Sequence, residues 1–258
     1  MGRSAPTEIT NPAQKFFEFS AEKGEIRYFD KSLGEKGENV TVPLPFQFLI
    51  LERGFQIAGG RKIGPRKNQE YLGYFSNFIR DLKTEHFLVR SKNGTEGEGV
   101  YADIKTQVNG AKLLLGLYIA FKDEDKQLQI GYLKLKGSAL SEWFDFARNK
   151  NVWAGAFAIT GREEIEGEQG KYFVPVFKQI LDIPADVEAQ ATAFDRDILT
   201  PYFKAYFNRK PVTEEVEEQP ELPTEDAEEV SVPQKSKAAN ASAEEADSPL
   251  DGDDEVPW

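Results

Sequence analysis

Apolar and polar residues alternate along much of the chain, and this pattern predicts a mainly β protein. It is clearest in 111–122 (AKLLLGLYIAFK) and 128–136 (LQIGYLKLK). Asn109-Gly110 favours a two-residue hairpin turn, so 99–108 is predicted to be the strand before them. Further strands are predicted within 15–30, which would form a hairpin, and within 39–52, 70–79, 85–91, 152–160 and 171–181. The segment 70–79 also fits a helix.

The period of the pattern changes after Ser138. Apolar residues then recur with helical spacing at Leu140, Trp143, Phe144 and Ala147. The predicted order over 99–181 is therefore strand-strand-strand-helix-strand-strand, which is typical of the five-stranded OB barrel. We expect an OB-like barrel in this range, with a β-rich extension before it and helices after Pro184 and Thr200.

Composition divides the chain into a body, 1–211, and a tail, 212–258. The tail holds 16 acidic residues against two lysines and has no aromatic residue before Trp258, so we expect it to be disordered. The body is close to neutral, with 30 basic and 28 acidic residues, and 53–92 holds nine basic against three acidic residues. Such asymmetry indicates a nucleic-acid partner, although an acidic tail that only aids solubility is the alternative.

Several function classes lack support in the sequence. Cysteine is absent and His86 is the single histidine, so no metal site, cofactor site or catalytic triad is recognisable and we expect no enzyme activity. No apolar run approaches the roughly 20 residues of a membrane helix. The first residues lack the apolar core of a secretory signal, so we expect a soluble, cytoplasmic protein.

One face of the predicted barrel has the composition of a nucleic-acid surface. Strand alternation would place on it Tyr101, Lys105, Lys112, Tyr118, Lys122, Tyr132, Lys134 and Lys136. Bases stack on aromatic rings whatever their identity, and lysines neutralise phosphates. The alternative is that tyrosines are common on strands and lysines are common on surfaces.

A second candidate surface lies in the glycine-rich segment 59–75. Its basic and aromatic residues are Arg61, Lys62, Arg66, Lys67, Tyr71 and Tyr74. Glycines let the backbone approach a ligand closely, so this segment is predicted to contact phosphates. A solvated loop before a core strand would explain the same residues.

The chain ends in DDEVPW: Asp253, Asp254, Glu255, Val256, Pro257 and Trp258. This ending resembles the acidic C-terminal tip of bacterial and phage single-stranded DNA-binding proteins, with Trp in place of the family's terminal Phe. The resemblance implies an OB fold, binding of single-stranded DNA in replication, recombination or repair, and a tip that recruits partner proteins. The long body suits a divergent phage version. An annealing or recombination mediator and a non-enzymatic phage structural or assembly protein remain alternatives, and the oligomeric state stays open.

Overall fold

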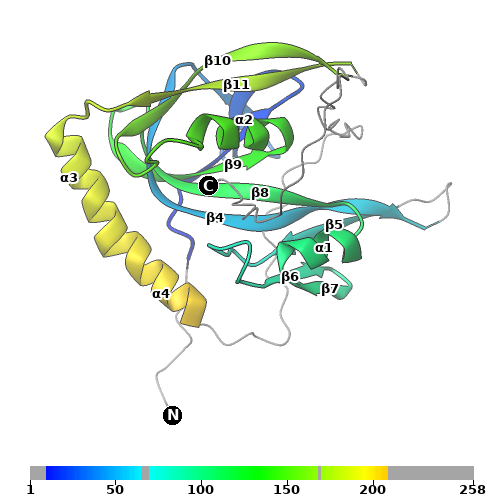
Figure 1. Cartoon of the computed structure of the whole chain (residues 1–258). Helices are drawn as coiled ribbons and strands as arrows, with labels where there is room; N and C mark the ends of the chain where they lie inside the picture. Colours follow the sequence, from blue (N-terminus) through cyan, green and yellow to red (C-terminus); the bar gives the residue numbers. More distant parts are fainter. Residues whose placement is uncertain (1–9, 65–69, 168–169, 209–258) are drawn as a thin grey trace, which may run out of the picture.

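The computed structural model of the chain describes residues 10–64, 70–167 and 170–208 (Figure 1). The strands are β1 (Lys15–Ser20), β2 (Glu25–Asp30), β3 (Glu38–Val42), β4 (Phe46–Ile63), β5 (Glu70–Ser76), β6 (Phe87–Ser91), β7 (Gly94–Gly99), β8 (Ala111–Lys122), β9 (Leu128–Lys136), β10 (Ala156–Gly167) and β11 (Gly170–Ile180). The helices are α1 (Tyr101–Gln107), α2 (Gly137–Ala147), α3 (Ala185–Phe194) and α4 (Thr200–Asn208), with a π-helical turn, η1 (Asp195–Leu199), before α4. The described part is mainly β, which confirms the predicted class.

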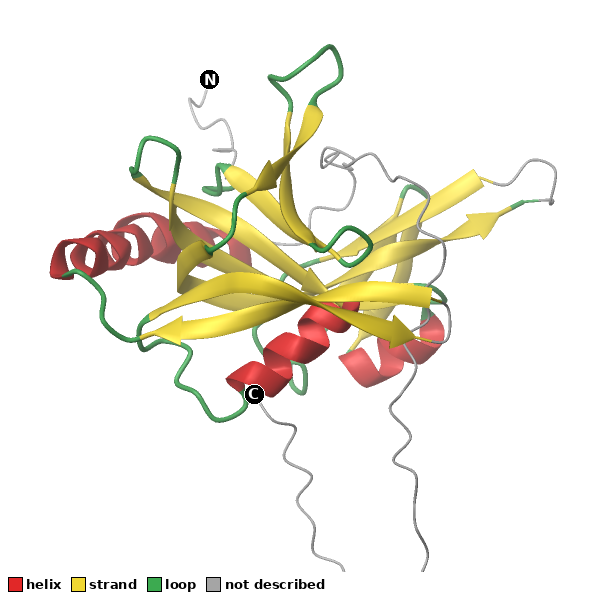
Figure 2. Ribbon diagram, turned by 90° about the horizontal axis from the view of Figure 1, so that it is seen from above, coloured by secondary structure: helices red, strands yellow, loops and turns green. Residues whose placement is uncertain are grey.

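The eleven strands of the described ranges form one mixed sheet, seen from above in Figure 2. Its main path runs β3-β2-β1-β9-β8-β4-β5-β6-β7, and β10 pairs with both β4 and β11. Strands β1 and β9 are parallel, and the other pairs are antiparallel. The sheet is open, because in the described ranges β11 pairs with β10 alone. A backbone N–H of Phe173 donates to the carbonyl of Ala21, 2.7 Å away, and links β11 to the turn after β1.

The prediction of a strand over 99–108 is wrong, because β7 ends at Gly99 and helix α1 follows. Ile104 and Val108 are both buried in an apolar cluster with residues of β4, β5 and β6. Residues four apart lie on the same side of a helix, and burial of this pair outweighs the alternation that favours a strand. The Asn109-Gly110 turn therefore joins α1 to β8.

The five-stranded OB-like barrel expected over 99–181 is not formed as a closed barrel, because the sheet is open. Its predicted first strand is the helix α1, and the strand that pairs with β8 is instead β4, from Phe48 opposite Phe121 to Gly59 opposite Ala111. The other predicted strands and helix α2 lie near their expected positions, although β10 begins only at Ala156. The C-terminal helices follow Pro184 as expected.

Two faces of the sheet are packed by different helices. We call the face that carries Leu115 and Leu117 of β8 the inner face, and its core includes Trp143 of α2, which is 2% exposed and contacts the ring of Phe157 edge-on at 5.4 Å. Helix α1 extends this packing beside β4 and β5. The opposite, outer face of β8 and β9 is partly covered by α3, η1 and α4, which follow one another as a single long helical segment (Figure 1).

Candidate nucleic-acid interface

The strand register brings most of the predicted barrel-face residues onto the outer face. The ladder between β8 and β9 gives one side to Lys112, Tyr118 and Lys122 of β8 and to Tyr132, Lys134 and Lys136 of β9. Tyr118 stands directly opposite Tyr132. The shared face expected for these residues of β8 and β9 is therefore present.

The two tyrosines are not an exposed platform, and that part of the prediction is wrong. Tyr118 and Tyr132 are each 4% exposed, and their ring centroids are 4.8 Å apart. Phe203 of α4 packs edge-on against Tyr118 at 5.2 Å, and the two hydroxyls of Tyr118 and Tyr202 are 3.4 Å apart. Burial raises the pKa of both strand tyrosines. The strand pattern alone predicts that these two rings are exposed, but the apolar side of the C-terminal helices covers them.

Two more of the residues predicted for this face are not on it, because they lie on α1. Tyr101 is half-buried, 6.5 Å from the ring of Phe87, and burial raises the pKa of its hydroxyl. Lys105 is exposed on the same helix. Since α1 packs with Ile57 and Leu72, neither residue joins Tyr118 on the outer face.

The outer face continues onto a hairpin arm, formed by 58–63 of β4 and 70–75 of β5 (Figure 1). Ala58 stands opposite Lys112 of β8, and four pairs further along the arm, on the same side of the sheet, Lys62 stands opposite Tyr71. Both Lys62 and Tyr71 are exposed. The arm therefore adds a cation and an aromatic ring to the face that holds the lysines of β8 and β9.

The other predicted residues of this segment behave differently. Arg61 points away from Lys62, and its Nη2 lies 3.9 Å from the Oε2 of Glu96. Tyr74 is buried on the inner face, and among the described side chains its hydroxyl is buried without a hydrogen-bond partner. Arg66 and Lys67 lie outside the described residues, as do Asp253, Asp254, Glu255, Val256, Pro257 and Trp258.

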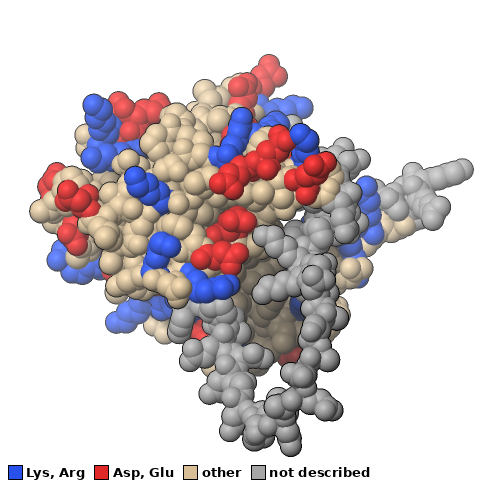
Figure 3. Space-filling model, turned by 45° about the horizontal axis from the view of Figure 1, so that its top comes forward, with Lys and Arg blue, Asp and Glu red and all other residues tan. Residues whose placement is uncertain are grey.

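We call the part of the outer face that carries Lys112, Lys134 and Lys136 the uncovered half, because the C-terminal helices pack elsewhere on this face. Charged side chains there surround one carboxylate. Glu18 of β1 lies 2.9 Å from the Nζ of Lys136 and 3.7 Å from Arg27. Burial lowers the pKa of the neighbouring Lys134, and Glu18 partly offsets this shift. Cations therefore outnumber the carboxylate here. On the face shown in Figure 3, by contrast, basic and acidic side chains are interspersed.

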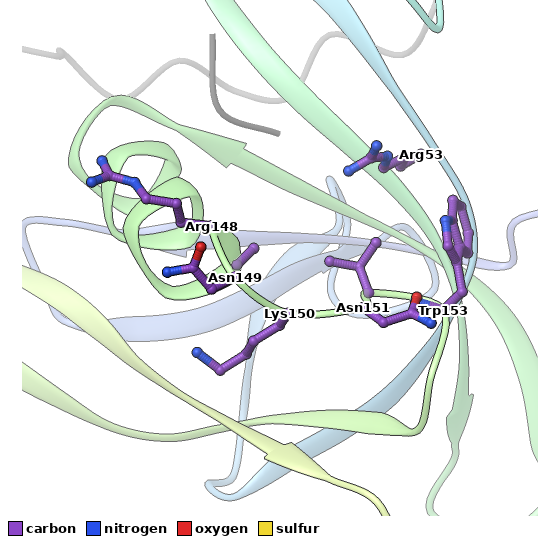
Figure 4. A pocket seen from close by; sticks show the side chains of 8 residues that line it. Arg53, Arg148, Asn149, Lys150, Asn151 and Trp153 are labelled. Carbon is purple, nitrogen blue, oxygen red and sulfur yellow. The ribbon is translucent and has the colours of Figure 1, made fainter. Parts of the chain in front are cut away.

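A pocket that is not predicted from the sequence lies beside β4. It has a volume of about 300 Å³ and is lined by Arg53, Ala147, Arg148, Asn149, Lys150, Asn151, Val152 and Trp153. Figure 4 shows Arg53 and Trp153 together on one side of the hollow and Arg148 to Lys150 on the other. The available signal is the order Arg-Asn-Lys-Asn-Val-Trp, basic residues followed by an indole, which strand prediction over 152–160 hides.

Replacing Gly116 with Ala should destabilise the outer face by about 1–3 kcal/mol, because a Cβ there would overlap the hydroxyl and ring of Tyr132. Tyr132 would have to move away from Gln56, to which its hydroxyl donates. Gly161→Ala is the matched control, because no atom beyond Gly161 and its two chain neighbours lies within 4 Å of its Cβ position. Urea unfolding measures both, and equal effects would contradict the close approach at Gly116.

Two further features of the described residues concern membrane spans and metal ligands. Within these ranges no helix is long and apolar enough to cross a membrane. No group of three or more His, Cys, Asp or Glu side chains there is placed to hold a metal ion.

In comparisons with known proteins, no protein-family model, no curated protein and no solved structure matches the chain.

Proposed function

We propose that the chain binds single-stranded DNA without sequence preference, along the uncovered half of the outer face and the arm. One observation supports this most: the strand register puts Lys62, Tyr71, Lys112, Lys134 and Lys136 on one continuous side of β4, β5, β8 and β9. Lysines there would neutralise phosphates, and Tyr71, at 51% exposed, offers its ring to a base.

We also propose that this body is a divergent OB-like fold. The order β4, β8, β9, α2, β10, β11 is strand-strand-strand-helix-strand-strand, and β10 pairs with β4 as well as β11. In this interpretation, β5 to α1 form a long insertion between the first two strands. Loops between the first two strands of OB folds contact nucleic acids, which supports the arm as part of the interface.

The tail has a separate role in this proposal. Its 16 acidic residues would compete with DNA for the basic face, and Trp258 would fill an apolar pocket on a replication or recombination protein. These residues lie outside the described part of the chain, so the support for this role comes from their composition and their order.

The test is a titration of the full chain with a labelled dT oligomer and with a duplex of the same length, at several salt concentrations. Unstacked bases and flexible phosphates fit the proposed face, so the dT oligomer should bind more tightly than the duplex. Its log affinity should fall linearly with log salt, with a slope of roughly −0.7 per phosphate contact. Absence of dT binding at low salt, or equal affinity for the duplex, would contradict the proposal.

A further inference from the structure

One edge of β4 changes partners along its length. Phe46, Phe48 and the residue between them pair with β10, Phe55 forms an isolated bridge to Ile79, and pairing with β5 begins at Ala58. Between these contacts, residues 49–54 have no strand partner on this edge among the described residues. The pocket that contains Arg53 lies at this gap.

The exposed indole in the pocket is held in place by its own loop. Trp153 is 54% exposed, yet its backbone N–H donates to the Oδ1 of Asn151 at 3.0 Å. The side chain of Gln179 in β11 donates to the carbonyls of Asn151 and Ala154, at 3.2 and 2.7 Å. A large ring is therefore presented to solvent by a loop that is tied to the sheet.

The surroundings of this ring are basic. The guanidinium of Arg53 lies 5.8 Å from the Trp153 ring centre, and Arg148 and Lys150 line the other side of the pocket. The Nζ of Lys150 lies 4.1 Å from the ring centre of Phe146 and donates to its carbonyl, which fixes the ammonium group. The described lining residues include no carboxylate.

A second pairing of arginine with an exposed ring lies on the other side of the same stretch of β4. Glu52, next to Arg53, lines a pocket of about 230 Å³ together with Arg80 and Phe207. Phe207 is 41% exposed, and the Arg80 guanidinium lies 4.9 Å from its ring centre. Arg80 is ion-paired with Glu52, and Asp195 also lines this pocket, so the Trp153 pocket is the more basic of the two.

We propose that the Trp153 pocket takes one unpaired nucleobase, stacked on the indole, with the adjoining phosphates beside Arg53, Arg148 and Lys150. This inference rests on the proposed function and adds a contact separate from the outer face, so that a bound strand also reaches the unpaired edge of β4. An indole is a strong stacking partner for any base, and the cations of Arg53 and Lys150 suit a phosphate chain. Arg148 is ion-paired with Asp145 at 2.9 Å, so it would exchange this partner for a phosphate. A pocket of this volume has room for a single base.

Tryptophan fluorescence tests the proposal directly. Trp143 is buried, so in a Trp258→Phe protein Trp153 is the exposed indole of the described ranges. A dT oligomer should quench its emission, whereas an abasic oligomer of the same length, which keeps the phosphates, should quench it much less. Adding Trp153→Phe should remove the quenching. Trp153→Ala should weaken dT binding by roughly 5- to 150-fold, as expected for one lost stack, and leave abasic binding unchanged.

Controls separate this proposal from the wider function. Tyr71→Ala removes an exposed ring of the arm, so it should weaken dT binding but keep the Trp153 quenching at saturation. Suppose that the parent protein binds dT, that the Trp153→Ala protein binds dT equally well, and that dT does not quench the Trp153 emission. These results would overturn the base-stacking proposal for the pocket and leave the proposed function standing. A parent that does not bind dT would overturn both proposals. Quenching by a peptide of the last eight residues, with Phe at position 258, but not by dT would assign the pocket to an acidic peptide and overturn the base-stacking proposal.

Discussion

Replacing Lys62, Lys112 and Lys136 together with Ala should weaken binding of a dT oligomer on the order of 100-fold at about 50 mM salt. The three side chains lie on one face, and each is exposed. Each lysine that contacts a phosphate releases counterions from the DNA when the complex forms. Losing such a contact therefore flattens the slope of log affinity against log salt by roughly 0.7 per residue. Fluorescence anisotropy over a salt series gives both quantities.

A matched variant keeps the change in charge and moves it elsewhere. Lys83, Lys105 and Lys178 are exposed and lie on the loop after β5, on α1 and on β11. Changing these three to Ala alters the net charge equally but leaves the outer face intact, so the salt slope should stay close to that of the parent. If both triple variants lose affinity equally, binding depends on net charge rather than on the outer face.

Tyr118→Ala should lower the free energy of unfolding by about 3–5 kcal/mol, as expected for a buried aromatic ring. The ring packs against Tyr132, Phe78 and Phe203, with centroid distances of 4.8, 6.0 and 5.2 Å. Its removal leaves a cavity between the sheet and α4. Urea or thermal unfolding, followed by circular dichroism, measures the loss.

The conservative change Tyr118→Phe keeps the ring and removes only the hydroxyl, which lies 3.4 Å from that of Tyr202. We expect a cost of about 1 kcal/mol or less, and unchanged affinity for DNA. A loss of DNA binding by the folded Phe variant, or a cost below 1 kcal/mol for Tyr118→Ala, would contradict a structural role for this residue.

Local sequence predicts the strands whose two faces differ. Strands β8 and β9 have an apolar inner side and a mixed outer side, so alternation gives both their existence and the shared face of Lys112 and Lys134. Helix α1 escapes prediction because Ile104 and Val108 satisfy both a strand and a helix pattern, and the choice depends on the cluster they join. Alternation also cannot tell that Tyr118 is covered, because the covering residue Phe203 lies 85 positions later in the chain.

Part of the candidate site can also be predicted from the sequence, and part of it cannot. The lysines of the outer face follow from periodicity, and the pairing of Lys62 with Tyr71 requires the register of the arm. The pocket at Trp153 is not predictable from local sequence, because Arg53 comes from a strand about 100 residues earlier. The local order of 148–153 signals basic residues beside an indole, but only long-range packing adds Arg53 and forms the pocket.

Lysine footprinting of the unmodified full chain tests the outer face most directly. The protein is acetylated at low reagent concentration with and without a saturating dT oligomer, and the modified lysines are quantified by mass spectrometry. Bound phosphates should shield Lys62, Lys112 and Lys136, while Lys83, Lys105 and Lys178 keep their reactivity. Unchanged reactivity at the first three lysines under conditions where dT is bound would contradict DNA binding by this face.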